Sequence, residues 1–415
     1  MNIKITKAPV GGCVRVPGSK SMAQRLILAW ALSKTECCVT AHSGADDVLA
    51  MGECAKEIFA AIEEKRTSIP EPLKVGESGA VLRFVMPVLG ALGISADLKM
   101  EGRLPERPMD PLISQLRQHG VTVERAADDT YHVEGQLNGG IIELPGDQSS
   151  QFISGLLMAL PLIGENSELR IFGDIQSRPY VDMTLYVLAK SGITIIEDGP
   201  GDFYIQGNQK YRLEGEYEAE GDWSGAAFWL ALGATMREGL TVTGLNAESL
   251  HGDREIISIL KRMGADINVS DADITVRGGK LYSSITDCRN IPDLVPAIAI
   301  AACAAGGKTT ITNAERLRLK ESDRLRAITD VLRAFGVLVD ERADGLEIFG
   351  GGGFHGGTVS SHGDHRIAMM AACMRGLTPE GPAGDIIIYD AETVNKSYPG
   401  FFEDYRALGG DWEEI

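Results

Sequence analysis

Six similar segments recur along the chain at intervals of about 70 residues. In each one, a short polar or charged cluster runs directly into an apolar stretch rich in Ala, Gly and Leu. A helix that is apolar on every side must be buried, and polar residues at its start leave backbone N–H groups and the positive end of the helix dipole open to an anion. The segments span residues 19–32, 77–92, 147–162, 221–234, 291–306 and 363–376.

A second set of helical segments alternates with the first. Most of these carry apolar residues on one face only, as Ile256, Leu260 and Met263 do, and most end on a Gly suited to the position after a helix. We therefore expect them to be outer helices. They span residues 46–62, 107–121, 178–193, 252–267, 322–337 and 398–410.

Short runs with strand character, such as 121–125 and 385–390, separate the helices. Each repeat is therefore predicted to be strand, buried helix, strand, outer helix, strand, strand. Because 415 residues exceed what one hydrophobic core usually supports, the six α/β repeats are expected to form two domains of three. A doubly wound α/β fold is the alternative, but its helices are apolar on one face rather than all round.

Composition narrows the class of protein. A net charge of −18 argues against a general nucleic-acid or membrane-surface binder, since either needs a basic face. Seven cysteines, with Cys37 and Cys38 adjacent, form neither a disulfide framework nor a metal pattern, which indicates a reducing compartment and a cytoplasmic protein. No apolar segment reaches the roughly 18 residues of a membrane span, and the run to residue 32 follows a strand-like segment, unlike a signal peptide.

Cations gather at the repeat starts. A single Lys or Arg is usually a solvated surface residue, but eight of them at such positions on an acidic chain favour a local anion site. Three consecutive side chains, Ser149, Ser150 and Gln151, could hold a phosphate without adding charge. We expect two anionic groups bound in one cleft. The cations are Lys20, Arg25, Arg83, Arg107, Lys320, Arg324, Arg366 and Lys396.

Two acids lie among these cations. Asp293 begins an apolar helix, where it could be a general base at a reacting hydroxyl or an ordinary helix cap. Glu321 lies between Lys320 and Arg324, where it could be catalytic or part of a structural ion pair. Local sequence leaves both roles open.

Several other chemistries do not fit. The segment around Lys308 ends like a phosphate-binding loop, but Ala302 occupies the position of its first Gly. No GxSxG elbow, no HExxH pair and no dinucleotide-binding GxGxxG unit is evident. His355, His362 and His365 lack acidic or Cys partners at a clear spacing, so no metal and no cofactor are expected.

Taken in order, the polar clusters resemble a known family, the 5-enolpyruvylshikimate-3-phosphate synthases among the enolpyruvyl transferases. The matching motifs run from residue 17 to residue 399, and although each is weak alone, the ordered set is specific. They are PGSKS with Arg25, RPM at 107–109, SSQF at 149–152, SRPYVDMT at 177–184, EGDWS at 220–224, RLRLKESDRL at 316–325, DHRIAM at 364–369 and KSYP at 396–399.

The resemblance implies a two-domain inside-out α/β barrel built from six βαβαββ repeats, three in each domain, with the active site in the cleft between the domains. It implies that residues 1–17 plus 221–415 form one domain and residues 18–220 the other, with hinges near 17–20 and 218–222. The repeat count made above agrees independently.

The resemblance also implies the reaction. The enolpyruvyl group of phosphoenolpyruvate moves to the 5-hydroxyl of shikimate 3-phosphate, by addition and then elimination of phosphate, in the shikimate pathway to chorismate and aromatic amino acids. Such a transferase needs an acid and a base a few ångströms apart. The two small molecules are then the only partners expected of a cytoplasmic monomer, without nucleic acid, membrane, cofactor or metal.

Site roles follow from the resemblance position by position. Asp293 is similar to the base at the 5-hydroxyl, Glu321 to the proton donor to the methylene carbon, and Lys20 to a catalytic residue between the ligands. Expected shikimate 3-phosphate contacts are Lys20, Ser21, Arg25, Ser149, Ser150, Gln151, Ser177, Tyr180, Asp293 and Lys320. Expected phosphoenolpyruvate contacts are Lys20, Gly79, Arg107, Gln151, Arg324, Arg366 and Lys396.

The chain departs from the family pattern at a few positions. Glu77 and Ala80 stand where many members have Asn and Thr, Arg316 where Asn is common, and Trp223 where a small residue is usual. The resemblance further implies competition between glyphosate and phosphoenolpyruvate, with Gly79 leaving room for the inhibitor.

Two other functions fit the sequence less well. The sister transferase that acts on UDP-N-acetylglucosamine usually carries a catalytic Cys in its first domain, whereas here no Cys lies between Cys54 and Cys288. A catalytically silent anion-binding protein of the same fold is disfavoured because Lys20, Asp293, Glu321 and Lys396 are all present.

Overall fold

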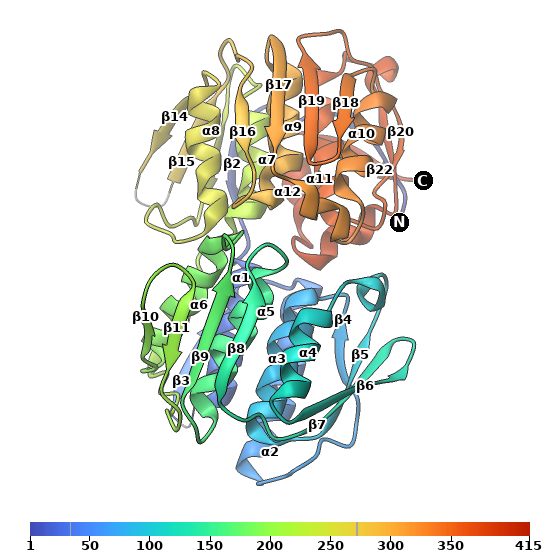
Figure 1. Cartoon of the computed structure of the whole chain (residues 1–415). Helices are drawn as coiled ribbons and strands as arrows, with labels where there is room; N and C mark the ends of the chain where they lie inside the picture. Colours follow the sequence, from blue (N-terminus) through green and yellow to red (C-terminus); the bar gives the residue numbers. More distant parts are fainter. Residues whose placement is uncertain (34, 271–272) are drawn as a thin grey trace. The chain divides into compact units, whose positions relative to one another are not determined.

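The computed structural model describes residues 1–33, 35–270 and 273–415, and the chain divides into two compact units (Figure 1). The terminal unit, which holds both chain ends, comprises Met1–Ser19, Ser43–Ala45 and Glu220–Ile415. The inserted unit comprises Lys20–His42 and Asp46–Ala219. The chain thus leaves the terminal unit after its first strands, returns briefly at Ser43–Ala45, and returns for the rest of its length from Glu220.

The inserted unit alternates buried and outer helices, as the apolar periodicity predicts. Its buried helices are α1 (Lys20–Leu32), α3 (Gly79–Leu92) and α5 (Ser150–Ala159), and its outer helices are α2 (Asp46–Glu63), α4 (Asp110–Gln118) and α6 (Arg178–Lys190). Its strands are β3 (Cys37–Thr40), β4 (Leu73–Gly76), β5 (Ala96–Met100), β6 (Val121–Ala127), β7 (Thr130–Gly135), β8 (Gly140–Pro145), β9 (Ser167–Phe172), β10 (Ile195–Glu197), β11 (Asp202–Ile205) and β12 (Gly215–Glu218).

The terminal unit repeats this plan. Its buried helices are α7 (Trp223–Gly233), α9 (Val295–Ala304) and α11 (His365–Met374), and its outer helices are α8 (Ile256–Arg262), α10 (Arg324–Ala334) and α12 (Phe401–Ala407). Its strands are β1 (Ile3–Lys7), β2 (Gly12–Arg15), β13 (Leu240–Thr243), β14 (Asp266–Val269), β15 (Asp273–Arg277), β16 (Ile285–Asp287), β17 (Gly307–Thr312), β18 (Leu338–Arg342), β19 (Gly345–Gly350), β20 (Gly357–Ser360), β21 (Ile386–Tyr389) and β22 (Asp411–Glu414).

Five small sheets share one topology. In each, the first two strands of a repeat pair in parallel across the buried helix, and an antiparallel pair then completes the sheet, as in the order β4-β5-β7-β6. The other orders are β10-β11-β9-β8, β14-β15-β13-β2, β16-β17-β19-β18 and β20-β21-β1-β22. This arrangement confirms the predicted α/β class and its βαβαββ unit.

The first repeat differs from the prediction. Residues 64–72, which are described throughout, form no strand pair, and only an isolated bridge joins Ser68 to Ser95. Pro70 and Pro72 explain the difference, because proline cannot donate to a strand ladder. The sheet of this repeat therefore has two strands, β12 and β3.

Some strands pair with partners that lie far away in the sequence. β2 immediately precedes α1 but pairs in parallel with β13, where Val14 lies opposite Val242. β12 takes the corresponding place beside β3, and β1 completes the sheet that ends in β22. The boundaries near residues 19 and 220 thus each follow a strand that pairs with a distant part of the chain.

The hydrophobic core of each unit surrounds its buried helices. All eleven residues of α7 are buried, and α7, α9 and α11 pack against one another inside the sheets of the terminal unit (Figure 1). Burying one Leu, Ile or Phe contributes about 1.5–3 kcal/mol, so helices apolar all round must lie inside. Trp223, the bulky departure from the family pattern, is fully buried in this core.

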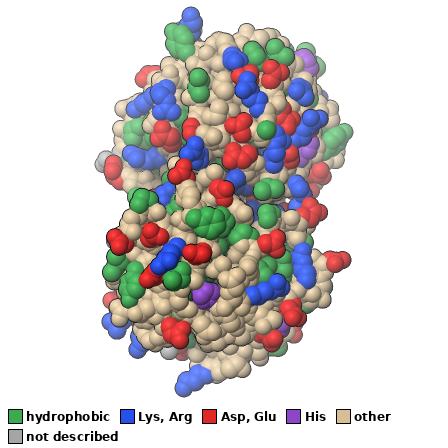
Figure 2. Space-filling view, viewed as in Figure 1, with side chains coloured by type: hydrophobic (Ala, Val, Ile, Leu, Met, Phe, Trp, Pro, Cys, Tyr) green, Lys and Arg blue, Asp and Glu red, His purple; other side chains and the backbone are tan. Residues whose placement is uncertain are grey.

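Charged side chains of both signs are spread over the surface (Figure 2). On the face shown in Figure 2, Lys and Arg side chains are interspersed with Asp and Glu and do not form one basic surface. Within the described ranges, no helix is both long enough and apolar enough to cross a membrane. All seven cysteines are free thiols.

Candidate functional site

Arg324 is the centre of a buried charge cluster in the terminal unit. Its side chain, 1% exposed at the start of α10, donates from Nη1 to Asp293 Oδ1 (2.7 Å), from Nη2 to Glu321 Oε2 (2.6 Å) and from Nε to Asp364 Oδ2 (2.6 Å). Burial alone lowers the pKa of Arg324, but these carboxylates outweigh it and raise the pKa. One guanidinium thereby holds the carboxyl groups of both predicted catalytic residues, Asp293 and Glu321.

Asp293 lies in a 3₁₀ turn, η4 (Pro292–Leu294), that leads into α9. Arg366 Nη2 donates to its Oδ2 at 3.2 Å, and Lys320 Nζ lies 3.5 Å from its Oδ1. Burial raises the pKa of Asp293, but Arg366, Lys320 and Arg324 outweigh it and hold the pKa well below its usual value. Asp293 is therefore an ionised carboxylate in this state.

The other expected residues of this unit are close by in the fold. Burial lowers the pKa of Lys320 to about 8, although Asp293 opposes the shift. Arg366 lies in the first turn of α11, and the buried Lys396 ends the 3₁₀ helix η8 (Ala391–Lys396), which packs against α11. Arg316, a departure from the family pattern, donates to the Arg289 carbonyl at 3.1 Å.

Sequence reasoning missed Asp364 and Asp253 in this cluster. Asp364, fully buried, caps α11 by accepting from Arg366 N (3.0 Å) while it pairs with Arg324. Asp253 is also fully buried and accepts from Ser224 Oγ at the start of α7; burial and the charge of Asp293 raise its pKa to about 6. An acid before an apolar helix was the available signal, but it is equally the signal of a simple cap.

Arg25 forms the main anion-binding candidate of the inserted unit. It is 2% exposed on α1, and its nitrogens donate to neutral oxygens: Thr184 Oγ1 (2.8 Å), Ser21 O (2.6 Å) and Tyr180 O (2.9 Å). Burial lowers the pKa of Arg25 to about 10. No carboxylate of the described ranges forms an ion pair with it. Its buried positive charge is therefore not neutralised by an acidic side chain, which makes it a candidate for binding an anion.

Arg107, which is half-buried, is a second anion-binding candidate of this unit. Its guanidinium lies against Gly79 at the start of α3, so closely that a Cβ on Gly79 would come within 2.8 Å of Arg107 Nη1. In the part of the chain that the structure describes, Arg107 has no ion-pair partner. The Glu77 carboxylate packs against Gly102 instead, where the backbone has φ +54°.

The hydroxyl-rich segments lie at helix starts, as the sequence predicts. Ser149 caps α5 by accepting from Gln151 N (3.3 Å), and Ser150 begins that helix. Ser177, in the left-handed conformation with φ +58°, precedes α6, which carries Tyr180. Backbone N–H groups at the start of a helix stabilise a nearby anion.

Lys20 begins α1 and forms an ion pair with Asp47 on α2 (Nζ to Oδ2, 3.0 Å). Asp47 was not singled out from the sequence because an acid in the first turn of an outer helix usually stabilises the helix dipole. Gln24 Nε2 donates both to the Asp47 carbonyl (3.0 Å) and to Ser78 Oγ (3.1 Å), which links the starts of α1, α2 and α3.

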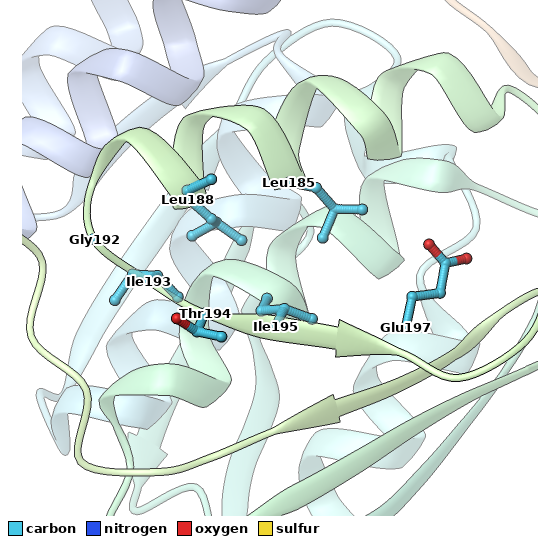
Figure 3. A pocket seen from close by; sticks show the side chains of 8 residues that line it. Leu185, Leu188, Gly192, Ile193, Thr194, Ile195 and Glu197 are labelled. Atoms are coloured by element: carbon cyan, nitrogen blue, oxygen red, sulfur yellow. The ribbon is translucent and has the colours of Figure 1, made fainter.

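A separate pocket between α6 and β10 lies apart from these clusters. It is lined mainly by Leu185, Leu188, Ile193 and Ile195, and Glu197 stands at one end (Figure 3). None of the expected site residues lines it, and no Lys or Arg is among its lining residues to bind a multiply anionic ligand. Across the described ranges, no three His, Cys, Asp or Glu side chains are grouped as metal ligands.

The chain matches known proteins along nearly its whole length. The family model described as EPSP synthase (3-phosphoshikimate 1-carboxyvinyltransferase) matches residues 5–405. Proteins named 3-phosphoshikimate 1-carboxyvinyltransferase from Clostridium kluyveri and Brachyspira hyodysenteriae are 37% and 36% identical to it, over 99% of this chain and 98% and 99% of theirs.

Solved structures give the same result. EPSP synthase from Acinetobacter baumannii superposes with a TM-score of 0.79 at 26% identity, covering all of both chains. The enolpyruvyl transferase NikO from Streptomyces tendae reaches the same score at 17% identity and so shares the fold. With its repeats, its charge clusters and these full-length matches, the chain belongs to the EPSP synthase (3-phosphoshikimate 1-carboxyvinyltransferase) family.

Proposed function

We propose that this chain transfers the enolpyruvyl group of phosphoenolpyruvate to the 5-hydroxyl of shikimate 3-phosphate and releases phosphate. The observation that carries the proposal is the cluster in which Asp293 and Glu321 both contact Arg324. It supplies two carboxyl groups, one on each side of a guanidinium that suits a substrate carboxylate.

Asp293 is the proposed general base. In the structure its charge is neutralised by Arg366, Lys320 and Arg324, which makes it a weak base. The anionic groups of phosphoenolpyruvate offer Arg324 and Arg366 other partners. When these two arginines bind the substrate anions instead of Asp293, the pKa of Asp293 rises. Asp293 can then accept the hydroxyl proton.

Glu321 is the proposed acid. It accepts a hydrogen bond from Arg324 Nη2 at 2.6 Å, which fixes its carboxyl group within the cluster. In the addition step the substrate oxygen bonds to C2 of phosphoenolpyruvate while Glu321 protonates C3. In the elimination step C3 loses a proton, the bond from C2 to the phosphate oxygen breaks, and phosphate leaves with the electron pair.

Two arginines of the inserted unit are the proposed phosphate contacts. Arg25, with its buried charge and no acidic partner, suits the phosphate of shikimate 3-phosphate, together with hydroxyl groups at helix starts. Arg107, held against Gly79, suits the phosphate of phosphoenolpyruvate. The proposed shikimate 3-phosphate set is completed by Lys20, Ser21, Ser149, Ser150, Gln151, Ser177, Tyr180, Asp293 and Lys320, and the phosphoenolpyruvate set by Lys20, Gln151, Arg324, Arg366 and Lys396.

A phosphate-release assay tests the proposal. Phosphate should appear only when both shikimate 3-phosphate and phosphoenolpyruvate are present, with one enolpyruvyl ether formed for each phosphate. Release with UDP-N-acetylglucosamine as the acceptor would favour the sister transferase, and binding of both ligands without release would identify a silent protein. A cytoplasmic location and a monomeric state are part of the same proposal, and size-exclusion chromatography with light scattering checks the second.

A further inference from the structure

Arg83 is buried on α3, in the same unit as Arg107 and Gln151, and the reaction scheme above gives it no role. It is 5% exposed, and its guanidinium lies over the Phe152 ring, 5.1 Å from the ring centroid. Burying such a charge is costly unless its hydrogen bonds are well made. The hydrogen-bond partners of Arg83 therefore indicate its role.

The local sequence brings α3 and α5 unusually close at this point. Pro87 has no N–H to donate to the Arg83 carbonyl one turn earlier, and Gly155 of α5 packs its Cα against that carbonyl, where any side chain would clash. The start of α5 is thereby held against the Arg83 side chain. Gln151, in the first turn of α5, lies within its reach.

The hydrogen bonds of Arg83 are directional. Nη1 donates to Gln151 Oε1 at 2.7 Å, and Nη2 donates to the Pro108 carbonyl at 3.3 Å. Pro108 follows Arg107 directly in the chain. A guanidinium can only donate, so the Gln151 amide must turn its oxygen toward Arg83. The amide NH₂ group then points away from Arg83. It can donate a hydrogen bond to an anion, which the amide oxygen could not do.

We propose that Arg83 is a positioning residue for phosphoenolpyruvate: it fixes the Gln151 amide with its NH₂ group toward the ligand and anchors the segment that carries Arg107. The inference rests on the proposed function, because it assigns the orientation of two residues of that site. Arg83 itself touches neither substrate.

A double-mutant cycle between Arg83→Met and Gln151→Ala tests this. Arg83→Met should raise the KM for phosphoenolpyruvate about tenfold or more, the factor that corresponds to one charge-assisted hydrogen bond, and leave the KM for shikimate 3-phosphate within about threefold. In the Gln151→Ala background the same substitution should raise the KM for phosphoenolpyruvate by about threefold or less, because the hydrogen bond to Gln151 is already absent.

Arg117→Met is the matched control. Arg117 lies on α4 of the same unit and donates from Nε to the Val123 carbonyl at 3.1 Å, so its loss also removes a guanidinium bound to backbone. It should change neither KM. If Arg83→Met does not fold, Arg83→Lys goes through the same cycle, and a smaller rise in the Gln151→Ala background again supports the proposal.

Equal rises in both backgrounds would overturn the proposal, as would a parallel rise in both KM values with a lower melting temperature, the sign of a merely structural arginine. The unsubstituted protein separates the two levels of inference. If it does not turn over shikimate 3-phosphate and phosphoenolpyruvate, the proposed function fails; if it does and the cycle shows no coupling, only the role of Arg83 fails.

Discussion

Replacing Asp364 should destabilise the terminal unit strongly, because this fully buried carboxylate makes two stabilising interactions. It pairs with Arg324, which is 1% exposed, and it caps α11 through Arg366 N. Breaking a buried ion pair costs about 3–5 kcal/mol, and losing a helix cap about 1 kcal/mol. Since Asp293 and Glu321 still neutralise Arg324, we expect about 4 kcal/mol for Asp364→Ala.

Asp364→Asn separates the two contributions. The Asn oxygen can still cap α11, but the charge is lost, so we expect about 2 kcal/mol. Glu255→Ala is the control, since its pair with Arg262 in the same unit (3.2 Å) is about half exposed and should contribute at most about 1 kcal/mol.

Urea unfolding followed by tryptophan fluorescence measures these free energies. Three of the four tryptophans, Trp223, Trp229 and Trp412, belong to the terminal unit, so the signal reports mainly on the part that contains Asp364. A loss below about 1 kcal/mol for Asp364→Ala, no greater than that of the control, would refute the view that Arg324 depends on this carboxylate.

Three further predictions follow from the charges and the close contacts. Because burial lowers the pKa of Lys320 to about 8, kcat/KM should fall above that pH as the ammonium loses its proton, and Lys320→Arg should move this fall to higher pH in a pH–rate profile. Gly79→Ala should displace the Arg107 guanidinium, which raises the KM for phosphoenolpyruvate and weakens glyphosate still more; inhibition competitive with shikimate 3-phosphate would contradict this placement. The pKa of Asp253 is raised to about 6, so its ionisation costs stability that grows from about pH 4 to 6 and is constant above. Asp253→Asn should therefore raise the melting temperature at pH 7.5 and lose this advantage as the pH falls toward 4, and an equal effect at both pH values would argue against it.

Local sequence pattern predicts the helices of this fold but not the pairing of its strands. The six buried helices can be predicted because a segment apolar on all sides, such as α7, has no stable position at a surface. The parallel pairing of β2 with β13 could not, since β2 is followed directly by α1 and nothing nearby indicates a partner more than 200 residues away.

The candidate site divides in the same way. Cations at helix starts could be predicted because their charge conflicts with the apolar run that follows, as at Arg25 and Arg366. Asp47 and Asp364 could not be told from ordinary first-turn or capping acids, because what distinguishes them is the cation that the fold brings to each. The orientation that Arg83 gives to Gln151 likewise depends on the close packing of α3 against α5.

Asp293→Asn tests whether the Arg324 cluster performs the transfer. Asn has the shape of Asp and can still hydrogen-bond a hydroxyl, but it cannot take up the proton, a role worth roughly 10²–10⁴-fold. The decisive measurement is the kcat of this variant for phosphate release, beside its equilibrium affinity for shikimate 3-phosphate. A kcat lower by that factor with affinity unchanged within about threefold is the expected result, whereas a kcat equal to that of the unsubstituted protein would contradict the assignment of Asp293 as the base.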